Sequence, residues 1–209
     1  MARYIGPVCR RCRYIGEKLM LKGEKCVTPK CPVEKRNVPP GEHSEARRRR
    51  ISDRGIQLRE KQKIRFSYGI MERQFRRFLA EATRAPGATP EGLLVLLERR
   101  LDNVIYYLGF ADSRAQARQV VQHGHILVNK HKVDIPSYLI NTGDVVEWRG
   151  SSVKTEYYKK VAEEIKGKII PSWLSVDLGK MTGHVLTLPG KDDINAKFNG
   201  KAVVEYYSR

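Results

Sequence analysis

Hydrophobic spacing first predicts a helical region in the middle of the chain. Residues 53–66 and 71–84 carry apolar side chains three and four positions apart, which is the spacing of amphipathic helices. Thr89 opens a third helix, because it can act as an N-cap and is followed by a proline and a glutamate in the first turn. The leucine-rich pattern of this helix continues to Leu108, and Gly109 is expected to end it.

The pattern changes after residue 109 and predicts a short helix followed by strands. Ser113 and Gln116 have the spacing of a capping box for a helix that reaches His123, with Gly124 as its terminator. Residues 125–133 then alternate as two strands around a turn at positions 129 and 130. Further strands are expected at residues 137–140, 145–148, 173–176, 184–188 and 203–207, and one more helix at 156–166. The expected fold class is therefore α+β, with short helices packed on a small antiparallel sheet.

The helix expected at 113–123 has two distinct faces. One face is apolar and should be buried; it consists of Ala117, Val120 and Val121. Arg114, Arg118 and Gln122 share the other face, since they are four residues apart. This second face has no acid, so we expect it to lie in solvent and to contact phosphates and 2′-hydroxyls. Lys130 and Lys132 at the following hairpin would add a second basic wall.

Charge supports a polyanionic partner. Forty Lys and Arg against twenty-three Asp and Glu give a formal charge of +17, and a surplus of this size is typical of nucleic-acid binding. An internal run, Arg47–Arg50, is the densest basic block and is expected to touch phosphate. No apolar run approaches about 18 residues and the first residues have no signal-peptide core, so we expect a cytoplasmic protein with no membrane partner.

All four cysteines lie in the first 31 residues, at Cys9, Cys12, Cys26 and Cys31. The C-x2-C and C-x4-C pairs have spacings that can place four sulfurs around one Zn²⁺, with a short hairpin between the pairs. Two disulfides or four free thiols are the alternatives, and clustering in a cytosolic protein favours zinc. Four cysteine ligands would leave no open position for water, so the ion would be structural and not catalytic.

Catalytic motifs are missing from the sequence. It contains no G-x-S-x-G, no H-E-x-x-H and no G-x-x-x-x-G-K-[ST]. Asp102 could be a catalytic carboxylate, but a helix-surface acid paired with a neighbouring arginine is the simpler interpretation. His125 could contact RNA, or it could be a half-buried residue at the start of a strand. We therefore predict a binding protein and not an enzyme.

Several motifs resemble one known family. Residues 97–148, "LERRLDNVIYYLGFADSRAQARQVVQHGHILVNKHKVDIPSYLINTGDVVEW", closely resemble the S4 RNA-binding domain. The wider chain is similar to the bacterial small-subunit (30S) ribosomal protein S4 family in "MARYIGP", "PPGEH", "LREKQKIR", "RQFRRF" and the ending "VEYYSR". The resemblance implies a zinc knuckle and basic linker at 1–50, a helical domain at 51–97 completed by 196–209, and the RNA-binding domain at 98–195.

The same resemblance implies what the chain does. Family members bind the five-way junction in the 5′ domain of small-subunit ribosomal RNA, nucleate subunit assembly, border the messenger entry channel, contact small-subunit protein S5 and influence decoding accuracy. It implies zinc at the four cysteines and entry-channel contacts at Arg47, Arg48, Arg49 and Arg50. The implied RNA-facing residues of the S4-type domain are Arg99, Arg114, Gln116, Arg118, Gln119, His123, His125 and Lys130, to which the hairpin adds Lys132.

Two alternatives stay open at this point. RNA-modifying pseudouridine synthases can carry the same domain and use an aspartate in an R-L-D context, which "RRLD" at 99–102 matches. This aspartate lies inside the domain's own first helix, and too few residues follow for a second domain of usual size. The other alternative is a zinc-dependent DNA-binding regulator, which would bind duplex DNA as well as it binds an RNA junction.

Overall fold

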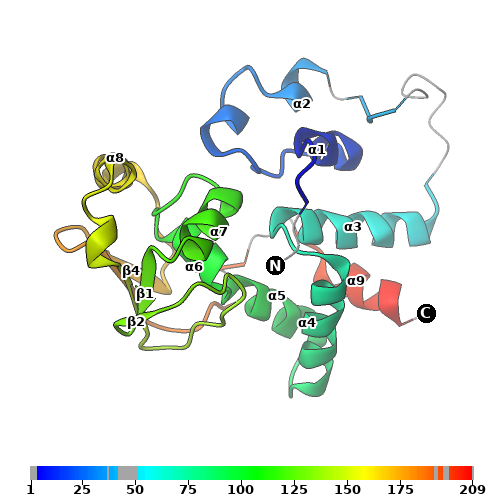
Figure 1. Cartoon of the computed structure of the whole chain (residues 1–209). Helices are drawn as coiled ribbons and strands as arrows, with labels where there is room; N and C mark the ends of the chain where they lie inside the picture. Colours follow the sequence, from blue (N-terminus) through cyan, green and yellow to red (C-terminus); the bar gives the residue numbers. More distant parts are fainter. Residues whose placement is uncertain (1–3, 37, 42–50, 191–192, 195–197, 209) are drawn as a thin grey trace. The chain divides into compact units, whose positions relative to one another are not determined.

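A computed structural model describes residues 4–36, 38–41, 51–190, 193–194 and 198–208 (Figure 1). The chain divides into two compact units, residues 1–94 with 196–209, and residues 95–195. The basic run Arg47–Arg50 lies outside the described residues. No helix in the described part of the chain is long and apolar enough to cross a membrane.

The first unit is helical. Its elements are α1 (Cys9–Ile15), η1 (Gly23–Cys26), α2 (Pro32–Lys35), α3 (Asp53–Ser67), α4 (Glu72–Arg84), most of α5 (Thr89–Glu98) and α9 (Gly200–Tyr207). The Ser52 hydroxyl caps α3 by accepting a hydrogen bond from the Gly55 amide at 3.3 Å. C-terminal α9 packs against α3 (Figure 1), and Gln57 donates to Glu205 at 2.9 Å. The helices expected at 53–66 and 71–84 are confirmed.

Two expectations for this unit are wrong. The hairpin expected between the cysteine pairs is replaced by α1, which continues to Ile15, and by the 3-10 turn η1. The strand expected at 203–207 is part of α9, because the Asn199 side chain caps a helix there by accepting from the Ala202 amide at 3.2 Å. Gly200 lets this helix approach α5 closely, since a Cβ at that position would lie 3.1 Å from Pro90.

The single helix expected at 89–108 is broken into α5 and α6 (Leu101–Tyr107). Arg100 adopts extended torsion angles, with φ of −65° and ψ of 136°. The backbone at this break forms hydrogen bonds with residues 138–140. The Leu101 amide donates to the Tyr138 carbonyl at 2.8 Å, and the Ile140 amide donates to the Arg99 carbonyl at 2.9 Å. These long-range bonds outweigh the local helical pattern.

The second unit contains a five-stranded antiparallel sheet in the order β2-β1-β3-β5-β4. The strands are β1 (Ile126–Val128), β2 (His131–Lys132), β3 (Val145–Trp148), β4 (Leu174–Asp177) and β5 (Thr182–Val185), with α7 (Arg114–Gln122), α8 (Glu156–Glu164), η2 (Gly150–Ser152) and η3 (Ile165–Gly167). The β1–β2 hairpin is confirmed, and its turn residues Asn129 and Lys130 have φ of 50° and 67°. Residues 137–140 form only an isolated bridge, and the strand expected at 184–188 is displaced to Thr182–Val185.

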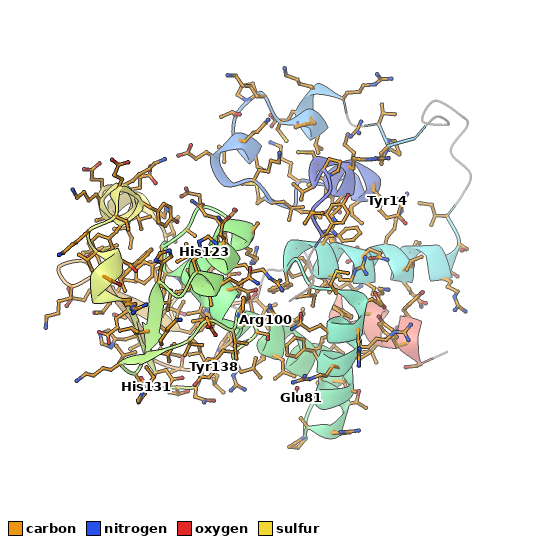
Figure 2. The ribbon with its side chains drawn as sticks, viewed as in Figure 1. Tyr14, Glu81, Arg100, His123, His131 and Tyr138 are labelled. Atoms are coloured by element: carbon orange, nitrogen blue, oxygen red, sulfur yellow. The ribbon has the colours of Figure 1, made fainter. Side chains whose placement is uncertain are left out.

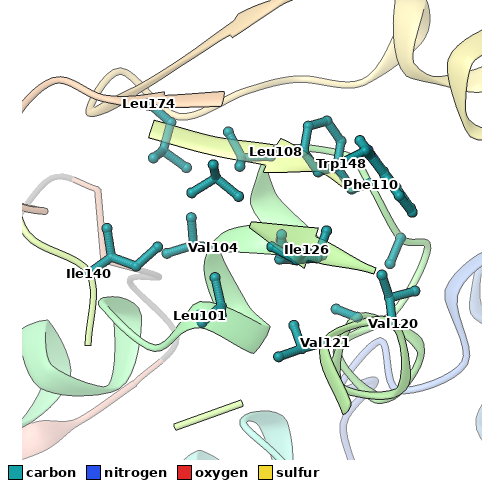
Figure 3. Packing of buried hydrophobic residues seen from close by; sticks show 14 of the residues in the cluster. Leu101, Val104, Leu108, Phe110, Val120, Val121, Ile126, Ile140, Trp148 and Leu174 are labelled. Atoms are coloured by element: carbon teal, nitrogen blue, oxygen red, sulfur yellow. The ribbon is translucent and has the colours of Figure 1, made fainter. Parts of the chain in front are cut away.

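The core of this unit lies between α6, α7 and one face of the sheet (Figure 3). Alternate strand residues are buried there, as the period of two requires: Ile126, Val128, Val146, Trp148 and Val185. Gly183 lets α6 come close, because a Cβ at that position would lie 2.5 Å from the Leu108 side chain. The prediction that Ala117, Val120 and Val121 pack inward is confirmed.

Candidate nucleic-acid interface

The helix α7 is fixed at both ends by its own sequence. The Ser113 hydroxyl accepts from the Gln116 amide at 3.3 Å, as the capping box predicts. The return bond differs from the usual pattern, because Gln116 Oε1 accepts from the Asp112 amide at 3.0 Å. At the other end Gly124 has a φ of 72° and turns the chain into β1. Side chains on α7 are therefore held in a defined orientation relative to the hairpin.

The prediction that Arg118 lies in solvent is wrong. Its side chain is buried, with 5% of the residue exposed, and its Nη1 lies 3.7 Å from Asp102 Oδ2. Asp102 also accepts from Arg100, through Nε at 3.0 Å and Nη2 at 2.7 Å. Burial of an arginine is costly unless a carboxylate pairs with it, as Asp102 does here. The side of α7 that carries this position faces α6. Arg118 therefore belongs to the interior of the unit (Arg100 is labelled in Figure 2).

Arg114 is half-buried and is also tied to α6. Its Nε donates to Asn103 Oδ1 at 2.6 Å, and its Nη2 donates to the Tyr107 hydroxyl at 3.2 Å. The guanidinium lies 4.7 Å from the centre of the Tyr106 ring, a cation–π distance. Burial and the nearby Glu98 carboxylate raise the pKa of Tyr107, which keeps its hydroxyl protonated. The guanidinium of Arg114 is thus held in place by hydrogen bonds to α6, and it does not lie on a freely solvated face.

The exposed side of α7 is formed by the residues that directly follow the predicted solvent positions 118 and 122. Gln119 and His123 are exposed there, and Gln116 is half-buried beside them. His125 follows, with its Nδ1 2.8 Å from the Ser152 hydroxyl oxygen and its ring centroid 5.9 Å from that of His123. Burial, together with His123 and Arg149, lowers the pKa of His125 and favours its neutral form. The structure therefore brings together Gln116, Gln119, His123 and His125 of the predicted RNA-facing residues (Figure 2 labels His123).

The hairpin tip presents cations next to acids. Lys130 and Lys132 are exposed, as predicted, and the Lys132 ammonium lies 3.8 Å from Asp134 Oδ2. Asn129 donates to Asp144 at 2.8 Å, which fixes the turn. Exposed ion pairs of this kind contribute little and dissociate readily, so Lys132 can still reach a phosphate. Figure 2 labels His131 at this hairpin.

Arg99, another predicted RNA-facing residue, contacts its own unit. Its Nε donates to the Ile140 carbonyl at 2.9 Å and its Nη2 donates to Asn141 Oδ1 at 2.6 Å. Both bonds hold the segment that breaks α5 from α6. Arg99 thus has a clear role in the fold.

Three residues near the α7 surface had no signal in the sequence. Trp148, Thr155 and Tyr157 line a groove of about 250 Å³ together with Gln116, Gln119, Val120, His123 and His125. They come from β3 and the start of α8, about thirty residues further along the chain, so only the folded sheet brings them to α7. Helical periodicity cannot predict a contact of this range.

The four cysteines are free thiols that line one small cavity, and Cys12, Cys26 and Cys31 are buried. Burial raises the pKa of the Cys12 thiol, a hydrogen bond from the Leu19 backbone opposes this, and the other three cysteines raise the pKa further. Among the described residues, no group of three or more His, Cys, Asp or Glu is arranged to hold a metal ion. Four sulfurs on one cavity are nevertheless the donor set that structural zinc uses.

Comparison with known proteins decides which family the chain belongs to. The family model "Ribosomal protein S4/S9 N-terminal domain" matches residues 3–98, and the model "S4 domain" matches residues 99–146. The proteins named small ribosomal subunit protein uS4 are 57% identical in Dehalococcoides mccartyi, 52% in Syntrophomonas wolfei and 51% in Thermus thermophilus. Each alignment covers the full length of both chains. The chain belongs to the uS4 family of small ribosomal subunit proteins.

Membership in the uS4 family excludes the enzymatic alternative. A uS4-family protein is a structural constituent of the small ribosomal subunit that binds ribosomal RNA; it is not an enzyme, and it is located on the ribosome in the cytoplasm. Asp102, the residue that suggested an RNA-modifying activity, is buried in ion pairs with two arginines. A carboxylate held in this way cannot approach a uridine base.

Proposed function

We propose that this chain is a primary binder of the five-way junction in the 5′ domain of small-subunit ribosomal RNA, where it nucleates assembly of the subunit. The S4-domain match supports this most directly, because its residues 99–146 comprise α6, α7, β1, β2 and the first two residues of β3. The exposed residues Gln119, His123 and Lys130 lie on these elements. They suit recognition of structured RNA through its backbone and shape.

The basic linker has a second role in this proposal. Arg47–Arg50 border the messenger entry channel and contact messenger RNA, and the chain contacts small-subunit protein S5 and thereby influences decoding accuracy. The resemblance to the family and the density of positive charge in this run support the assignment. Replacement of all four arginines by glutamine should alter misreading frequency in reconstituted subunits while binding of the junction RNA persists. Unchanged accuracy in such subunits would contradict this part.

A salt titration tests the RNA-binding proposal. Full-length protein is mixed with a junction RNA from the 5′ domain, and the dissociation constant is measured between 50 and 400 mM salt. We expect log K to fall linearly with log salt, because each neutralised phosphate releases counterions. Each phosphate contact should contribute about 0.7 to 0.9 to the steepness of this slope. A flat plot, or equal affinity for duplex DNA of the same length, would contradict the proposal and favour a DNA-binding regulator.

We also propose that Cys9, Cys12, Cys26 and Cys31 bind one structural Zn²⁺. The spacing of the four cysteines and their shared cavity support the assignment. Bound zinc would hold the thiols as thiolates and would tie α1 to η1 and α2. Elemental analysis should give about one zinc per chain, and a Cys26→Ser, Cys31→Ser variant should lose it. Purified full-length protein that holds no zinc, takes none up when it is added, and has four freely titratable thiols would contradict the proposal.

A further inference from the structure

The groove beside α7 has properties that its RNA-binding surroundings do not require. Its volume of about 250 Å³ is below the roughly 300 to 1,000 Å³ of pockets for drug-sized ligands, so it suits a single ring system. Backbone phosphates are bound mainly by arginine, lysine and backbone amides. A hollow between α7, the end of β3 and the start of α8 instead suits a group that can be inserted.

The lining combines aromatic walls with uncharged polar groups. Trp148 and Tyr157 have ring centroids 6.0 Å apart, and Trp148 also packs on Phe110 at 5.6 Å. Figure 3 shows Trp148 beside Phe110 at the end of the core, with Val120 of α7 below them. Gln116, Gln119 and Thr155 add amide and hydroxyl groups, and no Asp, Glu, Lys or Arg is among the lining residues in the described part of the chain. Such a surface matches an uncharged heterocycle better than a phosphate.

Two polar groups in the lining support a hydrogen-bonding ligand. The indole Nε1–H of Trp148 is buried and has no hydrogen-bond acceptor among the described residues, and only 7% of the residue is exposed. A buried donor without an acceptor costs about 1 to 3 kcal/mol. His125 uses its Nδ1 on Ser152, and its lowered pKa keeps the ring uncharged at neutral pH. The uncharged His125 ring and the aromatic wall of Trp148 and Tyr157 therefore suit a flat, uncharged partner.

Cations stand at the rim of the groove. The Arg149 amide donates to the His125 carbonyl at 2.8 Å, and the Lys132 side chain passes over Gly124, where an added Cβ would lie 2.5 Å from Lys132 Cε. A phosphodiester chain following this rim would place its bases near the groove. Charge complementarity thus favours a nucleic-acid strand over an uncharged metabolite as the source of the heterocycle.

We propose that this groove receives one unpaired base of the bound RNA, inserted between Gln119 and His123 on one side and Trp148 and Tyr157 on the other. The inference rests on the proposed function, because the base must belong to an RNA that the rest of the surface binds. It adds base insertion at a defined place to recognition by backbone and shape. RNA-binding modules commonly take up splayed bases against aromatic side chains in this way.

The test compares two RNAs and two variants of the full-length protein. Gln119→Ala with His123→Ala opens the groove through two exposed side chains, and His184→Ala on β5 is the matched control, because His184 is exposed and outside the groove. Affinity is measured for the junction RNA and for a fully paired RNA duplex with the same number of phosphates. We expect the double variant to lose about tenfold in affinity for the junction, since one stacked base contributes roughly 1 to 3 kcal/mol. The loss toward the duplex should be clearly smaller, because there the two side chains contact only the backbone.

A direct measurement accompanies the affinities. Ultraviolet cross-linking of the parent protein to the junction RNA, followed by mass spectrometry, should attach a nucleotide to a peptide containing His123, Trp148 or Tyr157. Equal weakening toward both RNAs, with no cross-link at these residues, would overturn base insertion while leaving the proposed function intact. Failure of the parent protein to prefer the junction over the duplex would overturn the proposed function itself, and base insertion with it.

Discussion

Each unit contains a carboxylate that pairs with several cations, but the two carboxylates differ in how far they are buried. In the sheet-containing unit, Asp102 holds Arg100 and Arg118, and its side chain is 4% exposed. In the helical unit, Glu72 holds Lys61 at 2.8 Å and Arg65 at 3.1 Å, and its side chain is 32% exposed. Each carboxylate thus joins cations of its own helix or its start to cations of another helix: Asp102 joins Arg100 to α7, and Glu72 joins Arg76 on α4 to α3. The strongest difference between the two clusters is the exposure of the carboxylate to water.

This difference in depth determines what each cluster contributes. Removing charges from water is expensive, so a buried cluster adds little net stability even when its geometry is good. Breaking it is nevertheless costly, because the remaining charges stay buried without a partner. At the half-exposed Glu72, water can replace the lost carboxylate. A graded series of substitutions, from the most buried to the most exposed ion pair, therefore tests the comparison.

The largest effect is expected for Asp102→Asn. The substitution preserves shape but removes the buried carboxylate that Arg100 and Arg118 share, so the free energy of unfolding should fall by about 3 to 5 kcal/mol. Both tryptophans of the chain, Trp148 and Trp173, lie in this unit, so urea unfolding followed by tryptophan fluorescence reports on it. Asp134→Asn, at an exposed pair in the same unit, is the control and should cost below about 0.5 kcal/mol. Equal small losses in both variants would remove the contrast between buried and exposed ion pairs.

A smaller loss is expected for Arg118→Met, which keeps an unbranched apolar side chain and removes the guanidinium charge. Asp102 retains Arg100, so the free energy of unfolding should fall by about 2 kcal/mol in the same measurement. Affinity for the junction RNA, measured at a temperature where the variant is folded, should stay within about threefold of the parent. Full stability together with strongly reduced affinity would instead make Arg118 an RNA ligand.

Arg118 also shows where prediction from sequence reaches its limit. The caps of α7 at Ser113 and Gly124 follow from residues within one turn, and the structure contains them. The burial of Arg118 depends on Asp102, whose position depends on the break between α5 and α6. That break is made by hydrogen bonds to residues 138–140, about forty positions away. Charge and spacing alone could not distinguish this arginine from a solvated one.

The candidate site divides in the same way. Gln119, His123 and Lys130 were found from the sequence and lie exposed on α7 and the hairpin. Trp148 and Tyr157, which complete the groove, had no signal, because they reach it only through the register of β3 and the start of α8. Local patterns predicted the helix and the turn, and the long-range pairing of the sheet determined what lies beside them.

A moderate loss, about 1 kcal/mol, is expected for Glu72→Gln in the helical unit. Burial alone would raise the pKa of Glu72, but hydrogen bonds from Lys61 and Tyr207 and the charges of Lys61 and Arg65 outweigh it, so the pKa is lowered. A carboxylate with a lowered pKa stabilises the fold above its unfolded-state pKa and loses that contribution as pH falls through its folded-state pKa. The difference in stability between parent and variant should therefore be full at pH 7 and vanish in acid.

Circular dichroism at 222 nm during urea unfolding measures this difference, because it reports on helices, including the helices α3 and α4 that Glu72 joins. Glu81→Gln is the matched control, since Glu81 is an exposed carboxylate on the same helix α4 (labelled in Figure 2). Its effect should be within about 0.5 kcal/mol at every pH. A Glu72→Gln variant whose deficit persists unchanged below pH 3 would show that packing, and not charge, holds the cluster.

The smallest effect is expected for Lys160→Gln, at the exposed end of the series. Lys160 and Glu164 are one turn apart on α8, with 3.4 Å between Nζ and Oε1, and the lysine side chain is 61% exposed. Such a pair contributes about 0.3 to 0.5 kcal/mol at low salt, and 1 M salt should abolish the difference from the parent. The loss at Asp102 should persist in that salt, because screening does not reach a buried cluster. If 1 M salt reduced both losses in proportion, Asp102 would be open to water and depth would not explain the contrast.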